Sequence, residues 1–452
     1  MRQRHRRLFR LCCGLCLLFV PFASPAQKTP IALTGTLVTP QEVVPQGTVL
    51  IQNGRILASG ATVKLPAGTK VVHTDGVIAP GLIDLHNHLT WNVLPRWKSI
   101  QEFGSRYDWQ QKPISKILLT VPHDALVKEG LECEMERYAE VKAISEGETS
   151  VVGSPQLSCV HGLARNLDYD PELDATFGHL GKILYNVFPF QMSEQELAAT
   201  KAALSAQPRG ALLIHVAEGA PNDASAAREF TMLKGRGLLL PGVSLIHGVA
   251  LKPENFAEMA KQGVGFIWSP RSNIELYGDT ANVAAAQAAG VRIALAPDWS
   301  PTGSDGLLGE LNYASIWNQT QAPPLFTERD LVLMATSNAA ELAGLSGELG
   351  SLAAGQAADL MVVRKIGQDA YWSLTHSTPQ ALQLVLIGGV PMYGDPSIFE
   401  QLTGSPGERL EICGTPKAVV VGSKSFAETE TTLDNALHQF GTKLAPLAEC
   451  GN

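Results

Sequence analysis

The sequence predicts an α/β protein: a (β/α)8 TIM-type barrel with a small composite β-sandwich domain formed from the N- and C-terminal flanks. Three observations lead to this fold. The 452 residues suit one barrel with a small companion domain. Apolar strand-like runs alternate with helix-like segments through the middle of the chain, which is typical of a parallel sheet. Short β-rich runs with turn signals occur on both sides of that region.

The two flanks carry the β-rich runs. These runs lie at 34–38, 47–51, 54–58, 358–363 and 382–389. Asn53-Gly54 separates the second run from the third, and this dipeptide is a strong signal for a tight hairpin turn. We therefore expect the two flanks to pair into one small β domain.

The central region contains the expected barrel strands. They lie at 81–85, 149–153, 183–188, 211–214, 243–246, 264–267 and 291–295. The last four each follow a helix-like segment, as in a regular barrel wall. The eighth strand stays open between residues 159–163 and the long insertion at 91–145.

The N-terminus resembles an export signal. The first ten residues carry five arginines and no acid, and an apolar run and Ser24-Pro25-Ala26 follow. A membrane anchor is the alternative, but the apolar run is shorter than the roughly 20 residues that a spanning helix needs. We expect a secreted or periplasmic protein that has no membrane contact after cleavage.

The expected organisation follows from these assignments. It comprises a signal peptide at 1–26, the N-terminal part of the β domain at 27–78, a barrel at 79–345, the C-terminal part of the β domain at 346–396 and a tail extension at 397–452.

The net charge of the chain limits the classes of molecule that it can bind. Removal of the five N-terminal arginines would change the net charge from −8 to −13. Nucleic acid is therefore excluded as a partner, a small-molecule substrate is expected, and a homo-oligomer stays open.

Four cysteines remain beyond the signal, and an exported chain permits disulfides. Four cysteines allow three pairings. Cys413 with Cys450 would tie down the tail, and Cys133 with Cys159 would form the other pair. Four buried thiols are the alternative.

Polar residues follow several of the expected strands, where barrel enzymes place their sites. His86 and His88 follow residues 81–85, and residues two apart on a strand point to the same side. His215, His247 and Asp298 occur at three later strand ends. Imidazoles with one carboxylate suit Zn²⁺ or Fe²⁺, with an open position for water.

These motifs resemble the amidohydrolase superfamily. The matching residues are Val77-Ile78-Ala79-Pro80-Gly81-Leu82-Ile83-Asp84-Leu85-His86-Asn87-His88, His215 with Glu218, His247, and Ala296-Pro297-Asp298. The resemblance spans roughly residues 31–395 and includes the late segment Gly350–Leu360. The His-x-x-Glu spacing is similar to the mononuclear branch that includes cytosine deaminase, imidazolonepropionase and chlorotriazine hydrolases.

The resemblance implies one divalent metal, Zn²⁺ with Fe²⁺ as the alternative. Its implied ligands are His86, His88, His215 and Asp298. Binuclear relatives bridge two metals with a carboxylated lysine. Residues 183–190 contain no lysine, and Lys182 lies at the wrong end of that strand. Lys142 is an alternative candidate for this bridging lysine, so a second metal ion is an alternative to the single one.

The implied reaction is hydrolysis of a non-peptide carbon–nitrogen bond, by cyclic amide or amidine hydrolysis or by deamination. In our hypothesis Asp298 takes a proton from the water, His247 polarises the attacked group, and Glu218 passes a proton to the leaving nitrogen. Two rival interpretations are a dipeptidase- or prolidase-like enzyme and an inactive relative that acts as a binding protein.

Other residues have open roles. The insertion after His88 contains Trp91, Trp97, Tyr107 and Trp109, which suits either an active-site lid or a self-packed loop. Arg271 or Asn273 could line the pocket. His161 and Arg165 could contact substrate, or they could be ordinary loop residues.

Overall fold

The structure is a computed structural model that describes residues 29–99, 101–155, 159, 163–178, 180–367, 369–422 and 424–450. The predicted signal peptide at 1–26 and His161 lie outside these residues. Among the described helices, none combines the length and apolar character needed to cross a bilayer.

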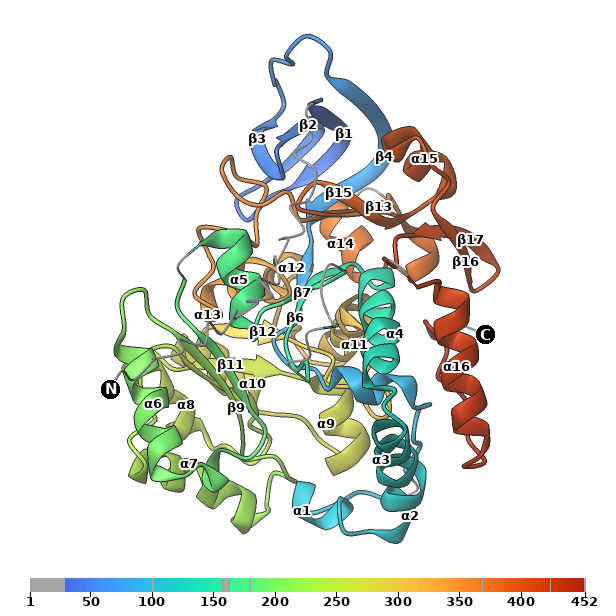
Figure 1. Cartoon of the computed structure of the whole chain (residues 1–452). Helices are drawn as coiled ribbons and strands as arrows, with labels where there is room; N and C mark the ends of the chain where they lie inside the picture. Colours follow the sequence, from blue (N-terminus) through green and yellow to red (C-terminus); the bar gives the residue numbers. More distant parts are fainter. Residues whose placement is uncertain are drawn as a thin grey trace, which may run out of the picture.

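Eight short parallel strands of the described chain form the central layer (Figure 1). They are β5 (Leu82–Ile83), β6 (Glu148–Val151), β7 (Arg165–Asn166), β8 (Ile183–Asn186), β9 (Ala211–Val216), β10 (Val243–His247), β11 (Gly265–Trp268) and β12 (Ile293–Leu295). All seven predicted strands are present. Strand β7 is the eighth strand. It begins at Arg165, just beyond residues 159–163, which are one of the two locations expected for it.

These strands lie side by side in chain order. β5, β6 and β7 form one parallel sheet, and β8 to β12 form another. The ends of β12 and β5 also meet, because the Asp298 N–H donates to the His86 carbonyl at 3.1 Å and the His88 N–H donates to the Asp298 carbonyl at 3.1 Å. Within the described residues no pairing joins β7 to β8. The α/β class is confirmed, whereas the strand pairing shows no closed barrel.

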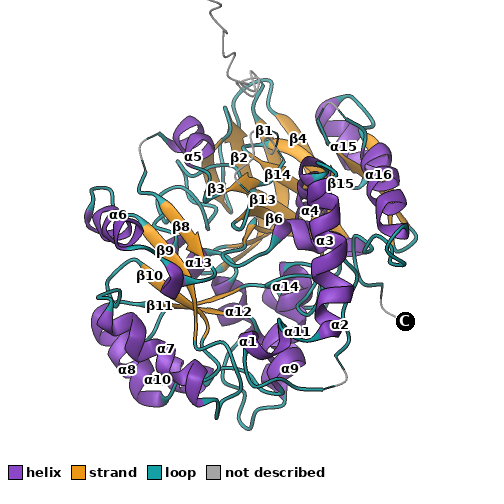
Figure 2. Cartoon of the chain, turned by 60° about the horizontal axis from the view of Figure 1, so that its bottom comes forward, coloured by secondary structure: helices purple, strands orange, loops and turns teal. Residues whose placement is uncertain are grey.

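Helices alternate with these strands, and Figure 2 shows α6, α7, α8 and α10 beside β8 to β11. They are α4 (Glu132–Ser145), α5 (Asp170–Phe177), α6 (Glu194–Ser205), α7 (Ala224–Gly235), α8 (Pro253–Gln262), α9 (Pro270–Tyr277), α10 (Val283–Ala289), α11 (Leu307–Gln319), α12 (Glu328–Met334) and α13 (Ser337–Leu342), with a 3₁₀ turn η3 (Pro189–Gln191) before α6. Ser193 and Glu196 form a capping box at the start of α6, and proline occupies the first turn of α8 and α9. These signals fix where each strand-end loop stops.

The insertion after β5 is helical. It contains η1 (Leu89–Val93), α1 (Arg106–Trp109), α2 (Pro113–Ser115), a π-helical turn η2 (Lys116–Thr120) and α3 (Val121–Lys128). We call residues 89–128 the lid segment. It is fastened to the loop after β9, because Ser105 pairs with Gly219 and the Ala220 N–H donates to the Gly104 carbonyl at 2.8 Å.

The two flanks build one sheet. Its strands are β1 (Ile31–Val38), β2 (Val43–Gln52), β3 (Arg55–Gly60), β4 (Lys70–Pro80), β13 (Leu360–Arg364), β14 (Leu382–Ile387), β15 (Val390–Gly394), β16 (Glu408–Ile412) and β17 (Thr415–Val419). β4 pairs with β13, so the predicted pairing of the flanks is confirmed. Asn53 and Gly54 both adopt positive φ, 52° and 76°, at the predicted hairpin turn. The strands form a single nine-stranded sheet, and the two-layered sandwich stays a prediction.

The C-terminal segment adds to that sheet and packs against α4. Helix α14 (Ala370–Thr375) and the turn η4 (Pro379–Ala381) lie between β13 and β14, while α15 (Pro396–Thr403) and α16 (Phe426–His438) follow later. The sequence predicts a tail extension at 397–452. In the structure β16 and β17 of this segment extend the sheet edge, and α16 lies beside α4 (Figure 1). Two disulfides, Cys133–Cys159 and Cys413–Cys450, are present, and they are the two pairings that the sequence favours.

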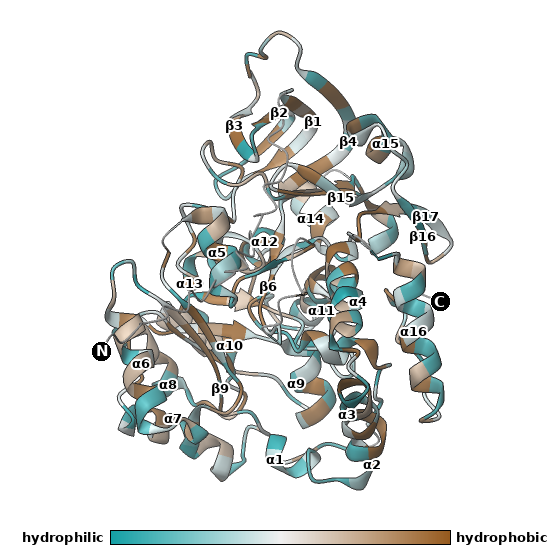
Figure 3. Ribbon diagram, viewed as in Figure 1, coloured by the Kyte–Doolittle hydropathy of each residue, from teal (hydrophilic) through white to brown (hydrophobic). Residues whose placement is uncertain are grey.

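An apolar layer underlies the strand ends. Leu213 precedes His215 by two residues on β9 and therefore faces the same side. Ile246 is the register partner of His215, and Leu213, Ile246 and Ile267 belong to one buried cluster. Figure 3 shows the hydrophobic colouring of β9. The polar residues at the strand ends are therefore underlain by a buried apolar layer.

Candidate metal centre

Four strand ends bring imidazole and carboxylate groups together. His86 and His88 follow β5, His215 lies in β9, His247 ends β10 and Asp298 follows β12. We call these five residues the His/Asp cluster. Together with Glu218 they supply three overlapping trios whose ligand atoms lie within 4.8 Å of one another: His86, His88 and His215; His86, His247 and Asp298; His215, Glu218 and His247. The structure thus brings the predicted metal ligands together, and their ligand roles stay predictions.

Asp298 lies at the centre of the contacts. Its Oδ1 is 3.1 Å from His86 Nε2 and 3.3 Å from His88 Nε2. The His86 ring centroid is 4.7 Å from those of both His215 and His247. His86 is completely buried, whereas the His88 side chain is 21% exposed. The cluster therefore opens towards solvent on the His88 side.

The backbone at two strand ends is left-handed. His247 has a φ of 68° and Asp298 a φ of 73°, and neither is glycine. Such conformations cost about 1–3 kcal/mol each and persist only where surrounding contacts hold them. At Asp298 these contacts are the backbone hydrogen bonds to the end of β5. This backbone conformation directs both side chains into the cluster.

Neighbouring polar groups orient the imidazoles. His86 Nδ1 hydrogen-bonds Ser269 Oγ at 2.8 Å, and His247 Nδ1 hydrogen-bonds Asn273 Oδ1 at 2.9 Å. Both rings therefore present Nε2 to the cluster. Asn273 lines the site in this way, whereas Arg271 turns away and pairs with Glu449 at 2.8 Å. Arg271 and Asn273 are both sequence candidates for lining the pocket. Of these two residues, only Asn273 contacts the His/Asp cluster.

The donor set fits a divalent metal. Among the described residues, the buried Nε2 atoms of His86 and His247 have no hydrogen-bond partner. Burial lowers the pKa of His86 to about 4, although Asp298 acts in the opposite direction. Burial also lowers the pKa of His215 well below its usual value. Neutral imidazoles with buried, unpartnered nitrogens are the form that a metal binds.

His215 connects the cluster to two further side chains. Its Nδ1 lies 3.1 Å from Glu218 Oε2, and its Nε2 lies 3.2 Å from the Tyr185 hydroxyl on β8. Tyr185 lies on β8, which contains no lysine. Lys142 is engaged elsewhere, because its Nζ is 2.7 Å from Asp305 and donates to the Pro446 carbonyl at 2.9 Å. Lys142 is therefore not a bridge in this structure.

Glu218 has four polar neighbours. The Tyr277 hydroxyl donates to Oε1 at 2.7 Å. Around Oε2 lie His215, then Arg106 Nη1 at 3.5 Å and His247 Nε2 at 3.6 Å. Burial acts to raise the pKa of Glu218, but His247, His215 and Arg106 outweigh it and the net pKa is lowered. Glu218 is therefore held as a carboxylate.

Asp298 is ionised for a similar reason. Burial acts to raise its pKa, but His86 and His88 outweigh that effect, and the net pKa lies well below its usual value. The Ser272 hydroxyl donates to Asp298 Oδ2 at 2.5 Å and leaves Oδ1 for the imidazoles. Asp298 and Glu218 are thus both held as carboxylates.

The lid segment supplies two residues to this network. Arg106 is 1% exposed, and its guanidinium also lies 3.2 Å from the Glu229 carboxylate. The backbone N–H of Arg106 donates to the backbone carbonyl of Glu218 at 3.2 Å. Trp109 Nε1 donates to the Tyr277 hydroxyl at 3.2 Å, and that hydroxyl in turn donates to Glu218. The insertion therefore touches the centre, as the lid interpretation expects.

Aromatic rings border the open side. Trp299 lies 5.7 Å from His88, and Trp91 and Trp109 each lie 5.7 Å from Trp299 between ring centroids. Trp91 also stacks on His123 at 3.8 Å. These rings form an aromatic cluster next to the partly exposed His88.

Several contacts could not be read from the sequence. Tyr185 and Tyr277 lie in segments typical of core positions, so nothing marks them. Arg106 and Trp109 stand in the insertion that the sequence singles out, without a sign that they reach Glu218. Arg165, considered there as a substrate contact, instead pairs with Asp359 at 2.6 Å and joins β7 to the composite sheet.

Comparison with known proteins agrees with this geometry. A family model described as the amidohydrolase family matches residues 172–392. The 5-methylthioadenosine/S-adenosylhomocysteine deaminase of Moorella thermoacetica is 26% identical over 357 residues, covering 71% of this chain and 82% of that protein. The 5'-deoxyadenosine deaminase of Methanosarcina mazei is 26% identical over 352 residues, covering 71% and 80%.

Solved structures share the fold. An adenosine deaminase from Xanthomonas campestris with bound zinc has a TM-score of 0.67 at 17% identity, covering 92% of this chain and 100% of that one. A guanine deaminase from Bradyrhizobium japonicum has a TM-score of 0.61 at 17% identity, covering 81% and 99%. At these identities the likeness shows the fold alone.

The buried imidazoles and carboxylates at the carboxyl ends of parallel strands define the class, a metal-dependent α/β hydrolase. The matching family model and the deaminase relatives support membership of the amidohydrolase superfamily. The chain is an enzyme that acts on carbon–nitrogen bonds other than peptide bonds, which agrees with the sequence prediction and disfavours both rival interpretations.

Proposed function

We propose that this chain is a zinc-dependent deaminase of nitrogen heterocycles, built on a TIM-type barrel. The observation that carries the proposal is Glu218, a buried carboxylate that lies beside both His215 and His247. A carboxylate in this place can move protons between a nucleophilic water and a leaving amine. Three neutral imidazoles and one carboxylate are donors that zinc accepts.

In this proposal, metal binding, polarisation of the substrate and proton transfer are assigned to separate side chains. Zinc held by His86, His88, His215 and Asp298 would supply Lewis acidity and lower the pKa of a water. Asp298, held ionised by its imidazole neighbours, accepts a proton from the attacking water. His247 presents Nε2 to the same space and polarises the attacked ring atom. Glu218, also ionised, accepts the second proton of that water and delivers it to the leaving nitrogen, which departs as ammonia. The proton held by Asp298 passes to the ring nitrogen beside the attacked carbon.

Two further features support the substrate class. The aromatic rings of Trp91, Trp109 and Trp299 suit a flat heterocycle. The Moorella and Methanosarcina relatives carry the names of nucleoside deaminases. We therefore assay ammonia release by the metal-loaded protein from adenosine, 5'-deoxyadenosine, 5'-methylthioadenosine and guanine, with dipeptides as the rival substrates. Turnover of dipeptides alone would contradict the proposal.

Glu218→Gln tests the role of the carboxylate. The amide keeps the shape but cannot carry a proton, so kcat should fall by about 10²–10⁴-fold while the metal content stays unchanged. Ammonia release and elemental analysis of the same preparations measure both quantities. Glu254→Gln, at an exposed position on α8, is the matched control. Full activity of Glu218→Gln would show that another group moves the proton.

We also propose that the enzyme is exported. The basic and apolar N-terminal residues support this, and so do the two disulfides, because such bonds persist in oxidising compartments. A fusion of residues 1–30 to alkaline phosphatase tests it, since that reporter is active only after export. An inactive, full-length fusion would overturn the proposal.

A further inference from the structure

A cavity of about 490 Å³ opens at the N-terminal ends of β9 to β12. Its walls include Ala211, Val243 and Gly265, which begin β9, β10 and β11, and Arg292, which precedes β12. The cavity therefore lies at the opposite end of the strands from the His/Asp cluster. The volume is within the range of small-molecule pockets. This cavity is therefore separate from the centre described above.

The cavity reaches the interior side of the strands. Ser244 is the register partner of Leu213, and opposite residues of parallel strands face the same side. Leu213 and Ile246 form part of the apolar layer between this cavity and His215. Barrel interiors are ordinarily filled by layers of side chains. Here six of the 18 lining residues are glycines, so side chains leave the space open.

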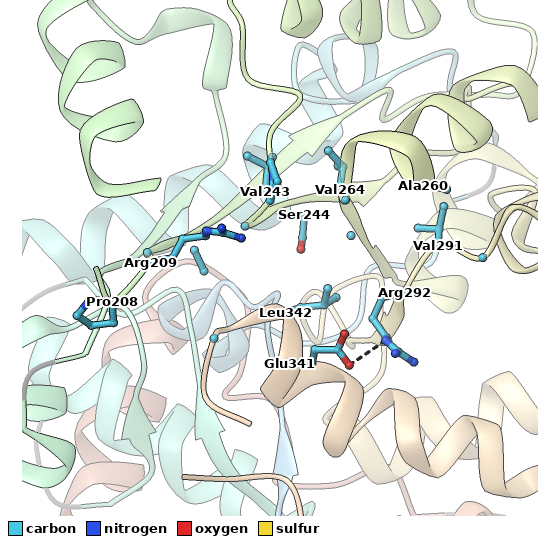
Figure 4. A pocket seen from close by; sticks show the side chains of 18 residues that line it. Pro208, Arg209, Val243, Ser244, Ala260, Val264, Val291, Arg292, Glu341 and Leu342 are labelled. Carbon is cyan, nitrogen blue, oxygen red and sulfur yellow. Dashed lines mark ion pairs between the residues drawn. The ribbon is translucent and has the colours of Figure 1, made fainter. Parts of the chain in front are cut away.

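One buried polar atom in the cavity has no partner. Ser244 is 1% exposed, and within the described chain its Oγ makes no hydrogen bond. A buried hydroxyl is ordinarily satisfied, because leaving it unpaired is unfavourable. Ser244 lines the cavity, and Figure 4 shows its hydroxyl directed into the open space. A ligand atom that accepts a hydrogen bond would satisfy it.

The charges at the rim favour an anion. Arg292 pairs with Glu341 at 3.0 Å, which balances both charges. Arg209 forms no ion pair or side-chain hydrogen bond with any described residue, although it lines the same cavity. In Figure 4 its guanidinium extends towards Val243 and Ser244, across from the Arg292–Glu341 pair. The cavity wall thus carries one charge without a protein partner, on the exposed Arg209, and one unpaired hydroxyl, on the buried Ser244.

We propose that this cavity binds a small organic anion. Its carboxylate or phosphate would accept hydrogen bonds from Arg209 and Ser244, and its apolar body would lie along Val243, Val264 and Leu342. A guanidinium suits both kinds of oxyanion, and the aliphatic walls suit a body of hydrocarbon. The site is independent of the proposed deaminase reaction.

Calorimetry on the metal-loaded protein tests the site, with phenylacetate as the probe. We expect saturable binding that Arg209→Ala weakens by about tenfold or more, because a charge-assisted hydrogen bond is lost. Ser244→Ala should weaken it as well. Arg228→Ala, at an exposed position on α7, should leave the affinity unchanged. Inorganic phosphate is the second probe and should bind more weakly, because it has no apolar body.

Three results would overturn the proposal. The first is no saturable heat with phenylacetate. The second is equal affinity in the Arg209→Ala and Arg228→Ala proteins. The third is phenylacetate binding that disappears when the metal is removed, since the probe would then occupy the His/Asp cluster. None of these results bears on deaminase activity, which is measured separately as ammonia release.

Discussion

At the scale of single residues, Glu218 depends on its neighbours to stay charged. A buried carboxylate alone would be protonated near neutral pH, because desolvation penalises the ion. Here His247, His215 and Arg106 overcome that penalty. Arg106 is the only one of these three that comes from the lid segment, since the two histidines lie on β9 and β10. The ionisation of Glu218 therefore depends in part on a residue of the lid segment.

Replacing Arg106 tests this coupling. In Arg106→Ala, Glu218 and Glu229 lose their shared cation, so we expect kcat to fall by about 10–100-fold with a smaller change in KM. Arg106→Lys should restore part of the activity because it returns the charge without the planar fork. Steady-state kinetics over a pH series measures both effects.

A purely structural role for Arg106 predicts a different pattern. Both variants would then lose thermal stability and activity together, and the pH profile of the remaining activity would match that of the wild type. A pH profile that shifts in Arg106→Ala and returns in Arg106→Lys distinguishes the positioning role.

At the scale of elements, the ends of β5 and β6 must approach closely. Gly153, just beyond β6, has a φ of 91°, and a Cβ there would lie 2.1 Å from the Asn87 carbonyl oxygen. Asn87 is the residue between the two histidines that follow β5. Because the obstacle is backbone rather than a flexible side chain, any side chain at residue 153 must displace the segment that carries His86 and His88.

Gly153→Ala should therefore lower metal affinity. We expect at least about a tenfold weaker affinity and a lower melting temperature, because the two imidazoles no longer converge. Gly130→Ala is the matched control: its φ of 77° imposes similar backbone strain, but a Cβ there has nothing within 4 Å. Metal titration of both variants measures the difference, and equal affinities would refute the steric explanation.

The same elements show what the sequence can and cannot predict. Strand-end histidines are visible because the strand period and the position after apolar runs fix where they point, as for His86 and His88. The alignment of Arg106 with Glu218 depends on the path of a long insertion, which no local pattern determines. Strands β16 and β17 escape prediction because their alternation is short, and their place at the sheet edge comes from pairing with distant β15.

At the scale of the whole molecule, the C-terminal segment connects the lid segment to α9. The Ala445 N–H donates to the Val93 carbonyl at 2.9 Å, and Glu449 pairs with Arg96 at 2.6 Å and Arg271 at 2.8 Å. Cys450 anchors the end of this segment to Cys413. The disulfide thus closes a loop whose far end touches both the lid segment and α9.

Removing that disulfide should destabilise the fold without emptying the centre. For a separation of 37 residues we expect Cys413→Ser/Cys450→Ser to lower the free energy of unfolding by about 2–4 kcal/mol. Denaturant titration measures this change, and elemental analysis should find the metal content unchanged. Cys133→Ser/Cys159→Ser is the comparison, because that pair joins α4 to the loop after β6 and lies outside the C-terminal segment. Unchanged stability would mean that the noncovalent contacts of the tail suffice.

Buried acids set the pH dependence of the whole fold. Glu146 is 2% exposed, and its Oε2 accepts the Gly309 N–H at 3.0 Å at the start of α11. Burial, with Asp305 nearby, raises the pKa of Glu146 from 4.5 to about 8. Between these two pH values the folded state keeps a proton that the unfolded state releases. The free energy of unfolding therefore falls as pH rises from 4.5 to 8 and is not lowered further by this group above that range.

Glu146→Gln isolates this contribution, because the amide is neutral at every pH and its oxygen can still accept the Gly309 N–H. From pH 5 to pH 8 the variant should lose roughly 2–4 kcal/mol less of its free energy of unfolding than the wild type. Denaturant titrations at the two pH values measure the difference, with exposed Glu254→Gln as control. Parallel losses in all three proteins would mean that Glu146 is ionised in the folded state, so that its buried charge is balanced by Lys142 rather than by a proton.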